Sequence, residues 1–198
     1  MALLLTELLT KSEIRAYCKT RRAELSNKER AELDASLCEH LADALGSFDT
    51  VLCFYPSKGE PNILPVIKEL IHVGKRIYLP LTHKEPPSLE FFEVSDLELD
   101  LETGAFGIPA PKQDLTKLAN IENAVCVVPA LAFDKRGYRV GYGKGFYDRF
   151  LYDKAIPTVG VCYSEFLTNM LPNDKNDVSV DIIITEKGVI RSRALKTE

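Results

Sequence analysis

The stretch RVGYGKGFYDRF, residues 139–150, concentrates the residue types best suited to bind a phosphate group. Glycine weakens the interior of a helix or strand, so its repetition here serves backbone geometry rather than packing. A glycine turn before a helix can present free backbone N–H groups to an anion, and Arg139, Lys144 and Arg149 add positive charge. The pattern therefore favours phosphate binding over a purely structural turn. The neighbouring aromatic residues offer flat surfaces for a base or another ring: Tyr142, Phe146 and Tyr147.

This glycine loop matches neither of the two common nucleotide-binding motifs. A P-loop has a glycine five residues before its Gly–Lys pair and Ser or Thr after it, whereas Tyr138 and Gly145 occupy those positions. The dinucleotide pattern G-x-G-x-x-G requires a third glycine where this chain has Phe146. Phosphate binding is thus predicted from composition and position alone.

Two further groups of charged residues could complete an anion or metal site. Lys11 and Arg15 are four residues apart and would share one helix face, although most such charges are simply solvated. Asp148 follows the glycine loop and could bind Mg²⁺ or stabilise the dipole of the next helix. A second carboxylate could come from Asp177 or Asp181. An extended chain would separate these two by about 13 Å, too far to bind one ion together.

Histidine and cysteine show no pattern that indicates chemistry. His40, His72 and His83 lack ligand-like spacing, and we expect the first two on helices and His83 in a loop. The five cysteines are scattered without a CxxC pair, which is typical of buried thiols in a reducing compartment. No Ser-His-Asp or Cys-His arrangement stands out, so we expect no protein nucleophile.

The composition indicates an ordinary globular protein. The chain has 198 residues, of which 45% are hydrophobic and 27% charged, enough for one well-buried domain. A net charge of −4 argues against nucleic acid or an anionic membrane as partner, so a local cluster must bind any anionic ligand. MALLLTELL lacks the basic region and cleavage site of a signal peptide and predicts an N-terminal arm or helical turn. With no run near the ~20 apolar residues of a spanning helix, we expect a cytoplasmic protein.

Helices are predicted first and an alternation of strands and helices afterwards. Thr10 with Glu13 and Ser26 with Glu29 both fit the capping box, and the second helix should end near Gly46. TVLCFYP, NILPVIKELIHVG and KRIYLPL then predict a strand, a crossover helix and a parallel strand. We expect one domain over residues 1–198, with N-terminal helices over 1–46 and an α/β core over 47–198.

Further strands are predicted at SLEFFEV, AVCVVPALAF, TVGVCY and VDIIITE, and the second of these is the most apolar and therefore central. A helix should follow the glycine loop over residues 146–153. DLELDLETG predicts a solvated connection. FGIPAPK predicts a loop, because proline is excluded from central strands and helix interiors.

VPALAFDKRGYRVGYGKGFYDRFL resembles the signature of 5-formyltetrahydrofolate cyclo-ligases, also called methenyltetrahydrofolate synthetases. Four more segments follow the family order, so the resemblance covers nearly the whole chain: KSEIR, FYPSKGEPN, FGIPAPK and LPNDKNDVSVDIIITE. It implies an α/β fold, a single three-layer domain with a mainly parallel sheet, similar to sugar-phosphate isomerases and coenzyme A transferases. It also implies an enzyme that uses ATP and Mg²⁺ to convert 5-formyltetrahydrofolate, with or without a polyglutamate tail, into 5,10-methenyltetrahydrofolate, ADP and phosphate.

The resemblance further implies the roles of residues around the nucleotide. Lys144 and Arg139 would be the catalytic cations that stabilise the transferring phosphoryl group. Asp148 would be a magnesium ligand, with Asp177 preferred over Asp181 as the second; Asp181 would have a structural task. The implied nucleotide-binding residues come from the first helix and the glycine loop: Lys11, Arg15, Arg139, Gly141, Tyr142, Gly143, Lys144, Gly145, Phe146 and Tyr147.

On the folate side, the resemblance implies that Glu60 accepts N–H donors from the 2-aminopterin edge, whereas the residues alone indicate only an exposed loop acid. Tyr55 and Tyr147 would also contact this substrate, and FGIPAPK would form part of the pocket wall.

The residues taken alone are also compatible with two other functions. A sugar-phosphate isomerase would use a similar glycine loop but would need an acid/base residue and neither ATP nor metal, and no isolated candidate stands out. A non-catalytic nucleotide-binding module would bind ATP without folate-dependent turnover.

Overall fold

The computed structural model describes residues 10–57 and 59–192, so the prediction for MALLLTELL lies outside the described residues. Both N-terminal helices begin as predicted: the Thr10–Glu13 and Ser26–Glu29 capping boxes are formed in full. Gly46 ends the second helix, again as predicted. The two helices are α1 (Lys11–Glu24) and α2 (Asn27–Leu45).

A seven-stranded sheet forms the centre of the described chain, in the order β12-β11-β9-β6-β1-β2-β3. Neighbouring strands from β11 to β2 all run parallel, and the two outer strands pair antiparallel. The prediction of a mainly parallel sheet with AVCVVP at its centre is therefore confirmed. The strands are β1 (Thr50–Leu52), β2 (Arg76–Lys84), β3 (Pro87–Val94), β6 (Ala124–Pro129), β9 (Thr158–Val161), β11 (Ile182–Thr185) and β12 (Gly188–Arg191).

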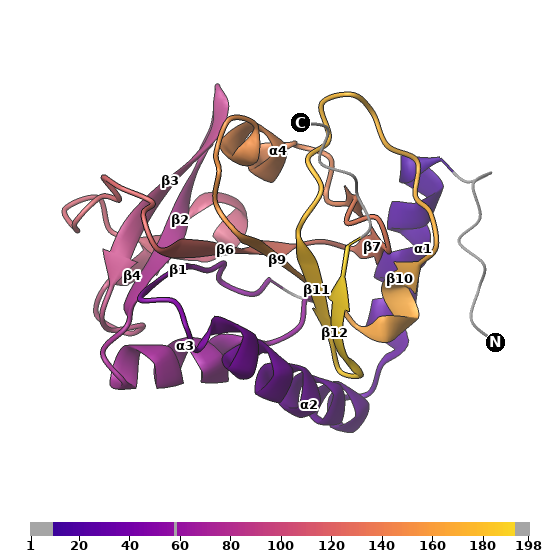
Figure 1. Cartoon of the computed structure of the whole chain (residues 1–198), viewed down its shortest axis with the longest axis horizontal. Helices are drawn as coiled ribbons and strands as arrows, with labels where there is room; N and C mark the ends of the chain where they lie inside the picture. Colours follow the sequence, from indigo (N-terminus) through magenta and orange to yellow (C-terminus); the bar gives the residue numbers. More distant parts are fainter. Residues whose placement is uncertain (1–9, 58, 193–198) are drawn as a thin grey trace.

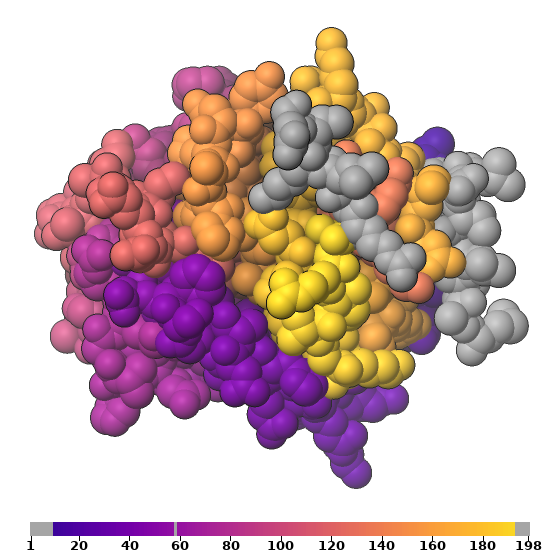
Figure 2. Space-filling view, in the orientation of Figure 1, coloured from indigo at the N-terminus to yellow at the C-terminus, as the bar shows by residue number. Residues whose placement is uncertain are grey.

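Helices cover both faces of this sheet, which gives three layers (Figure 1). On one face lie α2 and the crossover helix α3 (Leu64–His72), with Leu37, Leu41 and Ile67 fully buried between helix and sheet. The short helix α4 (Phe146–Leu151), which follows the glycine loop, packs on the other face. Figure 2 shows α2 beside the C-terminal strand β12 at the surface, and Ser36 Oγ donates a hydrogen bond to the Glu186 carbonyl in the turn before β12.

Two local predictions are wrong. FGIPAPK is not wholly loop, because β5 (Pro109–Pro111) pairs with β4 (Leu101–Thr103) in a separate two-stranded ribbon. Proline is tolerated there because such a ribbon has two open edges. DLELDLETG is a solvated connection as predicted, although it contains β4. His83 lies in strand β2 and not in a loop. The 3-10 turn η1 (Ala105–Gly107) joins the two ribbon strands.

A small second sheet, which was not predicted, carries the approach to the glycine loop. Its order is β10-β7-β8, and β8 ends immediately before Gly141. Helix α1 packs against it through the buried side chains of Ile14 and Cys18. The strands are β7 (Ala132–Asp134), β8 (Arg139–Val140) and β10 (Leu167–Thr168), with the 3-10 turn η2 (Ser164–Phe166) before the last.

All five cysteines are buried and free, as expected from the scattered spacing. Within the described residues, no helix combines the length and the apolar character needed to cross a bilayer.

Candidate functional site

A pocket of about 680 Å³ opens beside the carboxyl ends of β1 and β6, the usual ligand side of an open parallel sheet. Its walls come from α1, from the segments after β1 and β6, from the β2–β3 hairpin, and from η1 with β5. The pocket lining includes every site residue that the family resemblance implied: Lys11, Arg15, Tyr55, Glu60, Arg139, residues 141–148 and Asp177. Arg149 and Asp181, which the residue types alone also suggested, do not line it; Arg149 donates instead to the Pro87 and Lys144 carbonyl oxygens.

The glycine loop has a backbone that other residues would not adopt easily. Gly143 has φ +96° and Gly145 has φ +62°, both in the left-handed region where a Cβ atom is strained. A Cβ on Gly143 would also lie 3.3 Å from the Arg15 guanidinium carbon. Gly141 has neither constraint, and a Cβ there would meet no atom within 4 Å in the described chain. Its missing side chain leaves space in the pocket wall.

The pocket cations differ in how they are held. Arg15 donates from Nε to the Gly141 carbonyl oxygen at 2.8 Å, which fixes α1 against the glycine loop. Lys11 donates from Nζ to Asp174 Oδ2 and Asp177 Oδ2, both at 2.6 Å. Partial burial lowers the pKa of Lys11, but these hydrogen bonds outweigh it and the net pKa is raised. The ammonium group of Lys11 therefore stays charged.

Arg139 and Lys144 lie at opposite extremes of exposure. The Arg139 side chain is 6% exposed and donates to Asp148 Oδ1 and to the Val178 carbonyl oxygen, each at 2.6 Å. Lys144 is exposed and forms no ion pair with any residue that the structure describes. Lys144 is thus ready to meet an anion, whereas Arg139 first holds the Asp148 carboxylate in place.

The two candidate metal ligands each have one carboxylate oxygen in use. Asp148 Oδ1 also accepts from the Val178 backbone N–H at 3.2 Å, and Asp177 Oδ2 accepts from the Asp174 N–H at 2.8 Å. The described residues contain no group of three or more His, Cys, Asp or Glu side chains able to hold a metal by themselves. This arrangement fits Mg²⁺ bound through one or two carboxylates together with phosphate oxygens, and does not fit an all-protein cage.

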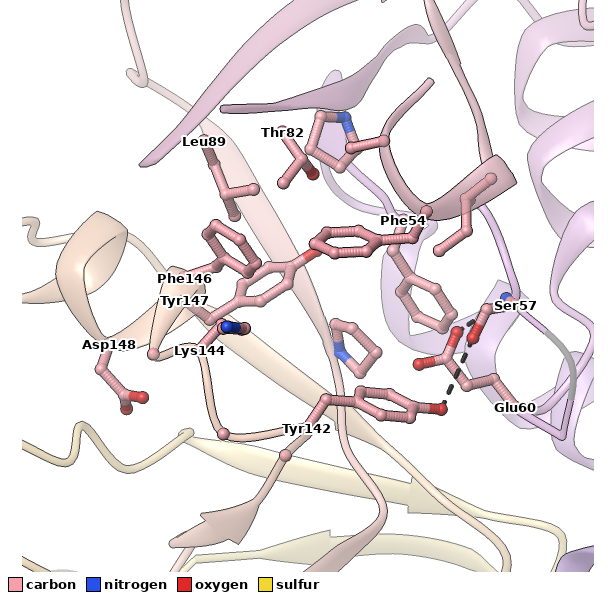
Figure 3. Close-up of a pocket in the computed structure, with 18 of the residues that line it drawn as sticks. Phe54, Ser57, Glu60, Thr82, Leu89, Tyr142, Lys144, Phe146, Tyr147 and Asp148 are labelled. Atoms are coloured by element: carbon pink, nitrogen blue, oxygen red, sulfur yellow. Dashed lines mark hydrogen bonds between the residues drawn. The ribbon is translucent and has the colours of Figure 1, made fainter. Parts of the chain in front are cut away.

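Polar groups of a different kind gather at the opposite end of the pocket. Figure 3 shows Ser57, Glu60 and Tyr142 together there, with Asp148 at the far end and Tyr147 between. Glu60 is only 7% exposed, and its Oε2 accepts from the Ser57 backbone N–H at 2.8 Å. The Tyr142 hydroxyl lies 3.5 Å from Ser57 Oγ, and burial followed by the nearby Glu60 charge raises its pKa.

Tyr147 presents a polar atom that the protein leaves unsatisfied. Its hydroxyl is buried and has no hydrogen-bond partner in the described part of the chain, and burial raises its pKa well above the usual value. A buried hydroxyl without a partner costs free energy, so a ligand that supplies one would recover it.

The structure adds residues that the sequence analysis missed. Ser57 and Asp174 line the pocket, and their positions in FYPSKGE and NDKND, three residues from Glu60 and Asp177, were the available signal. Thr82 and Leu89 come from the β2–β3 hairpin, which carried no signal at all. The structural task predicted for Asp181 is confirmed: its Oδ2 accepts from the Thr158 N–H and hydroxyl.

The comparisons with known proteins identify the same family. The model of the 5-formyltetrahydrofolate cyclo-ligase family matches residues 8–186, a range that contains the whole pocket lining. The 5-formyltetrahydrofolate cyclo-ligase of Escherichia coli (strain K12) is 32% identical over 145 residues, which cover 71% of this chain and 79% of that protein. The protein of the same name from Mycolicibacterium smegmatis is 27% identical over 93% of this chain and 98% of its own.

Two solved structures share the architecture. The NMR structure of 5,10-methenyltetrahydrofolate synthetase from Aquifex aeolicus superimposes with a TM-score of 0.81 at 33% identity, over 96% of each chain. The corresponding synthetase structure from Mycoplasma pneumoniae gives a TM-score of 0.73 at 23% identity, over 90% of this chain, and supports the fold.

Proposed function

The chain belongs to the 5-formyltetrahydrofolate cyclo-ligase family, and from that premise we propose that its pocket holds both substrates of the family reaction at once. The protein is a ligase of folate one-carbon metabolism that uses ATP. The observation that carries the proposal is the two-ended pocket, with cations and a glycine loop at one end and a buried carboxylate at the other. ATP would occupy the first end and 5-formyltetrahydrofolate the second.

The triphosphate would lie along the glycine loop and the pocket face of α1. Lys144 is free of ion pairs within the described chain, and the Arg15 guanidinium is oriented by its bond to the Gly141 carbonyl. Lys11 would exchange its hydrogen bonds to Asp174 and Asp177 for phosphate oxygens. Phe146 would border the nucleotide, whereas Tyr142, whose hydroxyl lies beside Ser57 and Glu60, would line the boundary between nucleotide and folate. This end thus supplies positive charge without a P-loop.

The folate would enter the opposite end with its pterin ring toward Glu60. A carboxylate can accept two N–H donors from a 2-aminopterin edge, and the buried Glu60 carboxylate lines the pocket beside the Tyr142 hydroxyl. Tyr55 lines the same wall, and Ala110 with its neighbours in β5 closes the pocket from the side. Tyr147, between the two ends, would donate its unsatisfied hydroxyl proton to a ligand at the junction. A glutamate or polyglutamate tail would extend toward solvent.

The reaction needs an activated formyl oxygen. Transfer of the γ-phosphoryl group to that oxygen releases ADP and gives an iminium phosphate; N10 then attacks the formyl carbon, loses its proton, and phosphate departs. The protein positions the two substrates and stabilises charge on the transferring group. Lys144 would contact that group directly. Arg139, behind Asp148, would orient this carboxylate and add positive potential.

Magnesium would be held by Asp148 and Asp177 through the carboxylate oxygens that accept no hydrogen bond within the described chain, Asp148 Oδ2 and Asp177 Oδ1. When bound together with ATP, the metal would offset charge on the phosphates. Because each carboxylate is already oriented by a cation, the site should accept the metal only as a complex with nucleotide. We also propose a cytoplasmic location, since five buried free thiols suit a reducing compartment.

The direct test follows the ultraviolet absorbance of 5,10-methenyltetrahydrofolate after mixing protein, MgATP and 5-formyltetrahydrofolate. The expected rise requires all three components. A flat trace from folded protein that still binds ATP would contradict catalysis and favour the binding-module alternative. If sugar phosphates raise the melting temperature of this protein and ATP does not, the isomerase alternative is favoured.

A further inference from the structure

Helix α1 carries a buried arginine outside the ligand pocket. Arg22 is 2% exposed and donates hydrogen bonds from Nη1 to the Gly59 carbonyl oxygen at 3.1 Å and from Nη2 to the carbonyl oxygens of Ala130 and Leu131, at 2.7 and 2.8 Å. All three acceptors are backbone atoms. Arg22 thus uses both ends of its guanidinium fork to hold two different segments of chain.

Those two segments form adjoining walls of the pocket. Gly59 belongs to the connection after β1 and directly precedes Glu60, while Ala130 follows the pocket residue Pro129 at the end of β6. Strands β1 and β6 are parallel neighbours in the sheet. Arg22 therefore ties together the segments that follow two adjacent strands, on the side where an open α/β sheet binds its ligand.

The same helix reaches the other end of the pocket. Lys11 and Arg15 lie on α1 and line the pocket beside the glycine loop. A helix is a rigid spacer, so its anchor at Gly59 determines how far the Glu60 carboxylate lies from those cations. The second contact of the Gly59–Asn62 segment is with α2, where the Asn62 N–H donates to Asp34 Oδ1 at 2.9 Å.

Burying the Arg22 charge costs free energy of desolvation, which its hydrogen bonds must offset. Its charge faces three carbonyl dipoles and the ring of Phe166, 4.9 Å from the guanidinium carbon, and its Nε atom has no partner in the described chain. An apolar side chain could fill the volume without burying a charge, but it could not hold three carbonyls. Lysine has a single donor atom and cannot span two segments as the planar fork does.

We propose that Arg22 is a positioning residue for the folate end of the site: it holds the Gly59–Glu60 segment against α1, so that the Glu60 carboxylate is fixed relative to the phosphate-binding cations. This rests on the proposed contact of Glu60 with the pterin. Arg22 touches neither substrate and acts through Glu60.

The test is a double-mutant cycle on kinetic constants with Arg22→Lys, Glu60→Gln and the double variant. We expect Arg22→Lys to raise KM for 5-formyltetrahydrofolate about tenfold or more, because small misplacements of a binding group are costly, and to change KM for ATP less than threefold. In the Glu60→Gln background the same change should have little further effect on the folate KM, because the group it positions is already altered.

Ile14→Val is the matched stability control, since Ile14 is fully buried on the same helix and lies outside the pocket. It should lower the melting temperature without a change in either KM. Arg22→Gln, which keeps two N–H donors without charge, serves if Arg22→Lys fails to fold.

The outcomes separate the two proposals. If Glu60→Gln alone leaves the folate KM unchanged, the pterin contact in the proposed function is wrong and the role of Arg22 falls with it. If Glu60→Gln raises the folate KM but Arg22→Lys only lowers the melting temperature, or acts equally in both backgrounds, the proposed function stands and Arg22 is merely structural.

Discussion

The two ends of the pocket handle charge in opposite ways. At the nucleotide end two of the cations already have acidic partners, with Lys11 bound to Asp177 and Arg139 to Asp148, and Lys144 has no ion pair among the described residues. Toward the folate end the polar groups have few partners: the buried Glu60 carboxylate accepts from a backbone N–H, and the Tyr147 hydroxyl, between the two ends, has no partner in the described chain. In the proposed arrangement a triphosphate would exchange with existing ion pairs as well as meet Lys144, whereas the folate would complete hydrogen bonds that are missing.

The largest effect expected is at Lys144, an exposed pocket cation whose ammonium group has no ion pair among the described residues. Lys144→Ala should lower kcat/KM about 10²–10³-fold, because it removes charge stabilisation of the transferring phosphoryl group. The melting temperature should not change, since the side chain is exposed. Steady-state kinetics with Lys135→Ala, an exposed lysine outside the pocket, is the control. Near-normal kcat/KM would remove Lys144 from the mechanism.

Tyr147→Phe tests the other side of the comparison, the buried Tyr147 hydroxyl that has no partner in the described chain. Turnover should fall about tenfold, the value of one lost hydrogen bond to a ligand. The melting temperature of the ligand-free protein should stay the same or rise, because the variant removes a buried hydroxyl that lacks a partner. Tyr152→Phe, on a tyrosine that is 73% exposed, is the matched control. A clear loss of stability without loss of turnover would contradict this role.

Asp148→Asn tests whether the Asp148 carboxylate, which pairs with Arg139, also binds magnesium. The magnesium concentration for half-maximal activity should rise several-fold, because a neutral amide is a poor ligand for a hard cation. The melting temperature should also fall, since the buried Arg139 loses its charged partner. Magnesium titrations of Asp148→Asn and of Asp153→Asn, an exposed acid two residues beyond α4, decide the case. An unchanged titration would mean that Asp148 serves α4 and Arg139 only.

Gly143 and Gly141 in the glycine loop form a matched pair of positions for substitution. Gly143→Ala should destabilise the protein by about 1–2 kcal/mol, because its φ of +96° is strained for a residue with a Cβ atom. Gly141→Ala should leave stability unchanged, because its Cβ would meet open space, yet raise KM for ATP if phosphate approaches the loop there. Thermal melts and ATP kinetics on both variants separate backbone strain from ligand access. Equal KM values for Gly141→Ala and wild type would rule out close approach at that residue.

The smallest effect expected is at Asp174, which competes for Lys11. Asp174→Asn should lower KM for ATP about twofold, in line with the weak strength of exposed ion pairs. The hydrogen bond from Lys11 lowers the pKa of Asp174, so the pair persists as the pH falls until that lowered pKa is reached. Wild type and variant should therefore differ at neutral pH and converge only in acid. A variant KM above the wild-type value would show that Asp174 helps to bind ATP.

Local signals in the sequence predicted the helices and the central strands well. The capping boxes at Thr10 and Ser26, the β1–α3–β2 unit and the apolar central strand β6 are confirmed. Errors came where short strands are defined only by the partner with which they pair. The strand Pro109–Pro111 exists because β4 lies beside it, and nothing in its own composition indicates a strand.

The sequence by itself identified residues that line the pocket, since a glycine loop, a basic helix face and the family motifs can each be recognised in short segments. Only the tertiary structure decided how those residues are paired. Lys11 and Asp177 are 166 positions apart in the chain, and Arg22 and Leu131 are 109 apart. Such contacts depend on which strands become neighbours in the sheet. Sequence periodicity does not reveal the strand order, because it indicates which residues of a segment are buried and not which segment packs beside it.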